Sequence, residues 1–203
     1  MYKNVLNKLN SPFSSQTEVD RELDNDSLLP NSFTYEKYFA GKYLGELARL
    51  ALIQLHQRGL FMSQNDKEFK KFLEKDAFTA AMLSQTQVEN ADIGEVLKQE
   101  LNIQNATKDD WSILKHVCNI LSQRCAILVA IPLSVFINRM DTKEHVGIAV
   151  TGSLYRYHPQ LKNLLETHIR KIVPNRSFHT FLSDDGSGKG AGLVAAVAAR
   201  LSN

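Results

Sequence analysis

Cysteine is scarce in this chain of 203 residues, in which only Cys118 and Cys125 occur. They lie seven positions apart in an apolar, helical-looking run, so they share a helix face but sit ~10 Å apart along its axis. A disulfide between them is therefore out of reach. Because no Cys-x-x-Cys pair and no histidine pair at ligand spacing accompanies them, we expect no metal site. Two reduced core thiols are typical of a cytoplasmic protein, which is the localisation that we expect.

Long hydrophobic runs and a charge excess of either sign are also missing. The longest apolar stretch covers residues 125–137, which is shorter than the ~20 residues needed to span a bilayer. The N-terminus has too few apolar residues for a secretory signal. The 24 basic and 22 acidic residues leave a net charge of +2, so no strongly charged surface attracts nucleic acid or an anionic membrane. We therefore expect a globular protein with no membrane span and no nucleic-acid partner.

The chain divides into a helical part and a shorter part in which strands and helices alternate. We expect residues 1–16 to form an irregular or disordered extension and residues 17–32 to form an irregular acidic segment. Apolar periodicity predicts helices over residues 34–57, 66–74, 77–86, 93–101 and 111–138. Further on, we expect strands at 145–150 and 178–182 and helices at 159–173 and 191–201. This βαβα order predicts an α/β fold with neighbouring strands covered by helices.

Three local signals refine the helical part. Thr34 is placed to cap the helix over residues 34–57, and Gly59 is placed to end it. Gly41 and Gly45 lie four apart on one face of that helix, where each glycine costs up to ~1 kcal/mol relative to alanine. Such a pair suggests that another part of the backbone approaches closely. Pro132 should kink or split the later long helix.

A glycine-rich turn, Gly186–Gly190, follows the second predicted strand and precedes a helix. Glycines let a ligand approach the backbone, and a helix N-terminus offers free N–H groups and partial positive charge to an anion. The turn is not a Walker A loop, because Ser183 and Gly190 occupy positions where that motif needs glycine and a hydroxyl residue. Taken alone, it is compatible with nucleotide binding or with an ordinary connection.

A second turn, Thr151–Arg156, follows the first predicted strand. Ser153 offers a hydroxyl group and Arg156 a fork of donors for a phosphate, although a surface turn explains both residues equally well. Ligands of α/β sheets collect at the carboxyl ends of the strands. Because both turns follow neighbouring strands, we expect them to lie side by side, and ordinary connections explain the two together less easily than either one alone.

Five ordered blocks of the sequence resemble the hexokinase/glucokinase family. From Thr17 to Leu201 they keep the order and spacing of that family over about nine-tenths of the chain. The blocks are Thr17–Asp24, Tyr35–Leu47, Val117–Arg124, Thr151–Arg156 and Leu182–Ala191. The resemblance implies the actin-like ATPase/sugar kinase (ribonuclease H-like) fold. Within it, residues 17–203 would form the C-terminal large lobe, a partial, helix-rich α/β unit with a small sheet.

The resemblance also implies an activity and a set of site residues. The family transfers the ATP γ-phosphoryl group to the 6-hydroxyl of a hexose such as glucose, the first step of glycolysis, with Mg²⁺ carried by the nucleotide. Glu36 matches a sugar-binding carboxylate, and Glu68 is aligned with a second one. Thr107 falls near a nucleotide contact. The phosphate and adenosine loops correspond to Thr151, Gly152, Ser153, Leu154, Tyr155 and Arg156, and to Gly186, Ser187, Gly188 and Lys189.

The chain departs from the family pattern in two ways. Thr151 stands where the family usually has Asp, which removes a carboxylate from the phosphate loop. The small-lobe blocks, Asp-Leu-Gly-Gly-Thr and Asn-Asp-Thr-Val-Gly, are missing, so we assign no catalytic residue. We expect a fragment or truncated form that needs a small lobe and does not phosphorylate glucose efficiently alone. The alternatives are a non-catalytic sugar- or nucleotide-binding or regulatory protein, and a gene start placed too far downstream.

Overall fold

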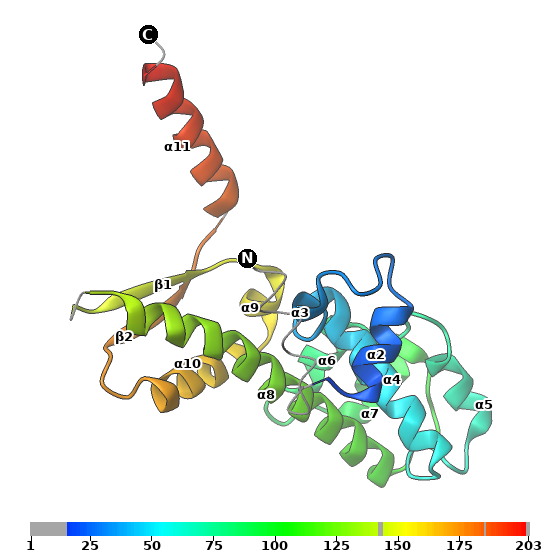
Figure 1. Ribbon diagram of the computed structural model, residues 1–203. Coiled ribbons are helices and arrows are strands. Elements are labelled where there is room, and N and C mark those ends of the chain that lie inside the picture. The colour runs from blue at the N-terminus through cyan, green and yellow to red at the C-terminus, as the bar shows by residue number, and fades with distance from the viewer. Residues whose placement is uncertain (1–15, 142–143, 185, 202–203) are drawn as a thin grey trace.

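The long helix α8 (Lys108–Arg139) joins two hydrophobic clusters in this computed structural model. The structure describes residues 16–141, 144–184 and 186–201, and Figure 1 shows how their helices and strands are arranged. Most of the expected residues 1–16 extension lies outside the described residues. In chain order the elements are α2 (Glu18–Asn25), α3 (Thr34–Lys37), α4 (Gly41–Gln57), α5 (Asp66–Phe69), η2 (Lys70–Phe72), α6 (Ala80–Thr86), α7 (Ile93–Leu101), α8 (Lys108–Arg139), β1 (Val146–Val150), α9 (Ser153–Tyr157), α10 (Leu161–Ile172), β2 (Phe178–Leu182) and α11 (Gly186–Leu201).

The first cluster packs α2, α4, α6 and α7 against the N-terminal half of α8. Leu44, Leu47, Phe72 and Leu114 are fully buried in it. Gly45 makes this packing possible, because a Cβ atom there would lie only 2.3 Å from the carbonyl oxygen of Phe78. The close approach expected at Gly45 is therefore confirmed, and it sets α6 directly against α4.

The second cluster lies between the C-terminal half of α8, helix α10 and the two strands. Ala130 and Ile137 from α8 pack there with Ile169 from α10 and Phe178 from β2. Strands β1 and β2 are parallel, with Val146 opposite Phe178 and Val150 opposite Leu182. The predicted strand, helix, strand order is confirmed, with the crossover made by α9 and α10.

Several helix predictions need correction. Residues 18–25, expected to be irregular, form α2 because Thr17 and Asp20 make a capping box. The helix expected over 34–57 is two helices, and Phe33 rather than Thr34 is the N-cap residue of α3. Over residues 66–74 the chain forms the short α5 and η2 instead of one helix.

Helix α8 runs unbroken through Pro132, so the proline does not split it. One further correction concerns the C-terminal helix. Helix α11 begins at Gly186, five residues before the predicted start at residue 191, and none of its residues is buried. It projects from the sheet instead of covering it (Figure 1).

By length and composition alone α8 could cross a membrane. In this fold it packs against α10, α4, α6 and α7, and its buried residues include the polar Asp110, Ser122 and Ser134. A core helix accounts for these contacts.

Candidate functional site

The two predicted turns meet at one edge of the sheet. Val150 and Leu182 are paired at the ends of their strands, and the Ser183 N–H donates to the Val150 carbonyl at 2.8 Å. The guanidinium group of Arg156 forms an ion pair with the Asp184 carboxylate across the two turns. The prediction that these turns lie side by side is confirmed.

The turn after β1 leads straight into helix α9. Gly152 adopts φ 128° and ψ 151°, a conformation that residues with a Cβ atom rarely reach. Because α9 starts at Ser153, the N–H groups of Ser153, Leu154 and Tyr155 have no acceptor within the helix. The exposed Ser153 hydroxyl lies beside them. This turn therefore gathers hydrogen-bond donors and one hydroxyl group at the end of β1.

Tyr155 and Arg156, both predicted at the phosphate loop, have partners of their own. The Tyr155 hydroxyl donates to Thr180 Oγ1 at 2.7 Å, and that hydroxyl donates to Glu166 Oε1 at 2.6 Å. Burial alone would raise the pKa of Glu166, but hydrogen bonds from Thr180 and the Arg170 guanidinium hold it below its usual range. Tyr155 thus fastens α9 to β2 and α10, whereas Arg156 stays largely exposed beside Asp184.

The turn after β2 is the first turn of a helix rather than an open loop. Gly186, Ser187, Gly188 and Lys189 open α11, and the Lys189 ammonium donates to the Asp184 carbonyl at 3.0 Å. The residues predicted near the adenosine therefore present the N-terminal end of a 16-residue helix next to the turn after β1. Two sets of helix N–H groups at one sheet edge suit a phosphorylated ligand.

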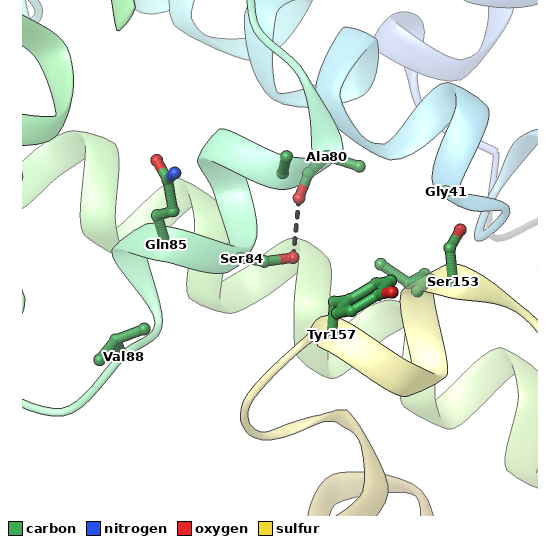
Figure 2. Close-up of a pocket in the computed structure, with 9 residues that line it drawn as sticks. Gly41, Ala80, Ser84, Gln85, Val88, Ser153 and Tyr157 are labelled. Carbon is green, nitrogen blue, oxygen red and sulfur yellow. Dashed lines mark hydrogen bonds between the residues drawn. The ribbon is translucent and has the colours of Figure 1, made fainter. Parts of the chain in front are cut away.

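A cavity of about 330 Å³ opens between α9 and α6, with the N-terminus of α4 at its side (Figure 2). Ser153 and Tyr157 from α9 face Ala80 and Ser84 from α6, and Gly41 closes the wall. Sequence reasoning missed the α6 residues and Tyr157. The available signal was the Gly41 and Gly45 pair, because Gly45 brings the start of α6 against α4.

A second cavity, of about 350 Å³, lies on the other side of the same turn. Its walls include Thr151 to Tyr155, Ala40 and Gly41 before and at the start of α4, and Cys125 and Val129 of α8. Burial raises the pKa of the Cys125 thiol to about 12, so this wall is uncharged. Both cavities are thus lined by the turn after β1 and by Gly41 at the N-terminal end of α4.

Glu36 stands on α3, just ahead of that end of α4. Its carbonyl accepts the Ala40 N–H at 2.9 Å, and its exposed side chain lines a cavity of about 400 Å³ with Lys42 and Tyr43. The neighbouring Lys37 is fully buried and anchors this segment. Its ammonium group donates to Asp24 Oδ1 at 2.5 Å, to Ser27 Oγ at 2.8 Å and to the Leu29 carbonyl at 2.7 Å.

Glu68 lies at the opposite end of α4 from Glu36. Next to it, Phe69 stacks at 3.5 Å on His56, in the last turn of that helix, which is about 25 Å long. The Glu68 carboxylate accepts the N–H groups of Gln104 and Asn105. Although burial alone would raise the pKa of Glu68, these and further amide hydrogen bonds hold it below its usual range. The structure therefore does not bring Glu68 to Glu36.

Thr107 is likewise away from the two turns. It is the N-cap residue of α8 and forms a capping box with Asp110, whose other oxygen accepts the Met62 N–H at 2.6 Å. Val129, beside the turn after β1, lies about 30 Å further along the same helix. Thr107 thus caps the start of α8 and does not lie at the two turns beside the sheet.

His158 directly follows α9, the helix that begins at the turn after β1. Its Nδ1 accepts the N–H groups of Gln160 and Leu161, so Nε2 carries the proton and donates to Ser122 Oγ at 2.9 Å. Ser122 Oγ in turn donates to the Cys118 carbonyl at 2.8 Å. Burial lowers the pKa of His158, which keeps the ring neutral. The histidine ties the end of α9 and the start of α10 to α8.

Comparisons with known proteins agree with this arrangement. A family model described as Hexokinase matches residues 4–197, so the match begins ahead of Thr17. Human hexokinase-1 is 35% identical over 202 residues, which cover 92% of this chain and 21% of that protein. Hexokinase-2 of Equus caballus is 33% identical over 204 residues, which cover 92% of this chain and 21% of that protein. The chain therefore spans about a fifth of the length of these curated relatives.

Solved structures extend the likeness to the fold. A hexokinase from Schistosoma mansoni in complex with glucose superposes with a TM-score of 0.77 at 29% identity, over 90% of this chain and 41% of that one. A second hexokinase crystal structure superposes with a TM-score of 0.72 at 22% identity, over 85% of this chain and 38% of that one. The fold is that of a lobe of the actin-like sugar kinases. The chain belongs to the hexokinase family.

Proposed function

We propose that this chain is the large-lobe part of an ATP-dependent hexose kinase, in which Glu36 binds the sugar and the two turns bind the phosphates. One observation carries the proposal. Ala40 and Gly41, one helical turn after Glu36, line the same cavity as the turn Thr151–Tyr155. A sugar held by Glu36 and a phosphate held by Ser153 would then be neighbours, as phosphoryl transfer requires.

The chemistry of each group fits its role. A carboxylate accepts hydrogen bonds from two sugar hydroxyls, and its charge strengthens both. The N–H groups at the starts of α9 and α11, together with Arg156 and Lys189, complement the charge of a triphosphate. The small side chains of Ala80 and Ala81 leave an apolar wall that suits a flat base.

We infer that Mg²⁺ arrives bound to the nucleotide. In the described residues no three histidine, cysteine, aspartate or glutamate side chains gather into a metal site. Oxygen ligands for such an ion stand at the turns in Thr151 and Asp184, which suits the preference of Mg²⁺ for oxygen. When bound, the ion would neutralise charge on the transferred phosphoryl group.

Titration calorimetry of the chain with glucose and with a non-hydrolysable ATP analogue tests the proposal. Glu36→Gln is expected to weaken glucose binding about tenfold or more without changing analogue binding, because hydrogen bonds to a charged group contribute ~1.5–3 kcal/mol. Ser153→Ala is expected to weaken only analogue binding. The matched control is Glu68→Gln, which should leave both affinities unchanged. Equal glucose affinity in wild type and Glu36→Gln removes Glu36 from the site.

Thr151 supports a second candidate, a hexokinase-like protein that binds sugar or nucleotide without turnover. Because the resemblance places a carboxylate at this position, Thr151→Asp is the discriminating variant. In an impaired enzyme the substitution should raise affinity for the magnesium complex of the ATP analogue. In a binding protein adapted to threonine, the added negative charge beside Asp184 should lower it. The buried thiols Cys118 and Cys125 support a cytoplasmic location for either form.

A further inference from the structure

Helix α8 has a backbone defect at Pro132. A proline has no N–H group, so the carbonyl of the residue four positions earlier, Leu128, loses its helical donor. The helix nevertheless continues from Lys108 to Arg139 without a break. A buried carbonyl without a partner would cost free energy, so the question is which group replaces the missing donor.

The hydroxyl of Tyr35 fills that place. Tyr35 stands on α3, and its hydroxyl donates a hydrogen bond to the Leu128 carbonyl. Burial raises the pKa of Tyr35, so the phenol keeps its proton at neutral pH and remains a donor. Its ring is held edge-on against Phe39 at 5.2 Å. Pro132 and Tyr35 are therefore complementary, although 97 positions separate them in the sequence.

Helix α3 depends on such anchors. It has four residues, which is far too short to be stable by itself. Phe33 enters it with a left-handed backbone, φ 53° and ψ 31°, which is unfavourable for a residue of this size. Lys37 fixes one side of the helix to Asp24, and Tyr35 fixes the other side to α8. Glu36 lies between these two anchors.

The same stretch of α8 also contacts the turn that we propose to bind phosphate. Cys125 and Val129 line the cavity under the turn Thr151–Tyr155, and the Cys125 thiol contacts the Phe39 carbonyl at 3.4 Å. A bond from Tyr35 to Leu128 therefore sets the position of Glu36 relative to that turn. It connects the sugar side of the site to the phosphate side through one helix.

We propose that Tyr35 is a positioning residue for hexose binding. Its hydroxyl caps the Leu128 carbonyl that Pro132 leaves free, and this bond holds α3 where Glu36 meets the sugar. The inference rests on the proposed function, because it takes Glu36 as the sugar ligand. It adds a pair, Tyr35 and Pro132, whose joint effect can be measured.

Four proteins test the pair: wild type, Tyr35→Phe, Pro132→Ala and the double variant. Glucose affinity is measured by calorimetry, and stability by the midpoint of urea denaturation. Tyr35→Phe should lower the midpoint because the Leu128 carbonyl loses the Tyr35 hydroxyl as a donor. In the double variant the new N–H at position 132 supplies a donor, so the effect of Tyr35→Phe on the midpoint should largely vanish. Such non-additivity identifies the shared carbonyl.

Glucose affinity should behave differently from stability. Tyr35→Phe is expected to weaken glucose binding about three- to tenfold, the range of one hydrogen bond. The double variant should remain equally weak, because α3 is still unanchored although the carbonyl is satisfied. Recovery of glucose affinity together with stability would show a merely structural role and overturn the proposal.

Two further variants separate this inference from the proposed function. Tyr38→Phe also removes a tyrosine hydroxyl, at the C-terminal end of α3. This hydroxyl makes no hydrogen bond within the described part of the chain, so the substitution should leave glucose affinity unchanged. Glu36→Gln reports whether the sugar site is right. If Glu36→Gln weakens glucose binding and Tyr35→Phe does not, only the positioning role fails. If wild type and Glu36→Gln bind glucose equally, or wild type does not bind it, the proposed function fails and the role of Tyr35 with it.

Discussion

Side chains of the predicted site differ in what else they do in the fold. Ser153 is exposed after the end of β1, and its hydroxyl makes no hydrogen bond to the residues that the structure describes, whereas the Tyr155 hydroxyl donates to Thr180. Arg156 has a partner, the Asp184 carboxylate, but both side chains of this ion pair are exposed. An exposed ion pair contributes at most ~1 kcal/mol, so a phosphate group can displace the Asp184 carboxylate at low cost. Arg156 therefore remains available to a nucleotide.

His158 gives the molecule a predictable pH dependence. Burial lowers its pKa in the folded state, while the unfolded chain titrates near ~6.5. As pH falls, the unfolded state therefore takes up the proton first, and stability that is complete above pH ~6.5 is lost below it. The expected loss reaches ~1.4 kcal/mol per pH unit. The carboxylates Glu68 and Glu166, whose pKa values are lowered, act only at more acidic pH.

Urea denaturation at pH 7.5, 6.5 and 5.5 measures this effect. His158→Gln should be less stable than wild type at pH 7.5 but should lose less stability on acidification. His168 is the matched control, because burial lowers its pKa as well but the ring is half-exposed. His168→Gln should therefore change the pH slope less than His158→Gln. Equal slopes in wild type and His158→Gln would show that the His158 ring does not stay neutral in the fold.

The contact between helices α4 and α6 shapes the cavity that we propose for the nucleotide base. We expect Gly45→Ala to destabilise the protein by ~1–3 kcal/mol, because its methyl group would meet the Phe78 carbonyl and the backbone at Thr79. The displaced α6 should also weaken binding of the ATP analogue. Chemical denaturation and calorimetry measure the two effects.

The control for this substitution is Gly192→Ala on α11. A Cβ atom there meets nothing within 4 Å, so the exchange should be neutral or stabilising by up to ~1 kcal/mol. Unchanged stability and nucleotide affinity in Gly45→Ala would contradict the tight packing of α6 on α4.

Local signals predicted the elements of the site better than its walls. The strands, the turn at Gly152 and the end of α4 near Gly59 follow from short-range patterns of β-branched residues and glycine. Two other features depend on contacts between distant segments, which periodicity does not encode. They are the cavity wall formed by α6 and the hydrogen bonds from the N–H groups of residues 104–105 to the Glu68 carboxylate. The capping box of α2 is encoded locally, by Thr17 and Asp20, although the acidic composition of the segment favours an irregular structure.

Helix α8 connects the two hydrophobic clusters and thereby the two parts of the proposed site. Its first half belongs to the cluster around α4, and its second half belongs to the cluster under the strands. Contacts from α3 through Tyr35 and from the end of α9 through His158 both end on this helix. The distance between Glu36, the proposed sugar ligand, and the turn after β1, proposed to bind phosphate, is therefore set through one helix.

The activity expected of these 203 residues alone depends on which catalytic and binding groups they contain. They include Glu36, the proposed sugar ligand, and the two turns proposed to bind phosphates, but the sequence has no Asn-Asp-Thr-Val-Gly block with a carboxylate to accept the hydroxyl proton. General-base help contributes ~10²–10⁴-fold, and the second phosphate loop adds further stabilisation of charge. We therefore expect binding of glucose and of the ATP analogue, but turnover at least ~10²-fold below the 1–100 s⁻¹ typical of kinases.

A coupled assay that follows glucose 6-phosphate formation at saturating glucose and magnesium ATP measures this turnover. Glu36→Gln serves as the control for contaminating kinase, because genuine activity of this chain must fall when the sugar ligand is removed. Turnover within the usual kinase range that disappears in Glu36→Gln would mean that a carboxylate of this chain acts as the base. Asp184, at the joined turns, would then be the first residue to replace by asparagine, because it is the acidic side chain paired with Arg156 there.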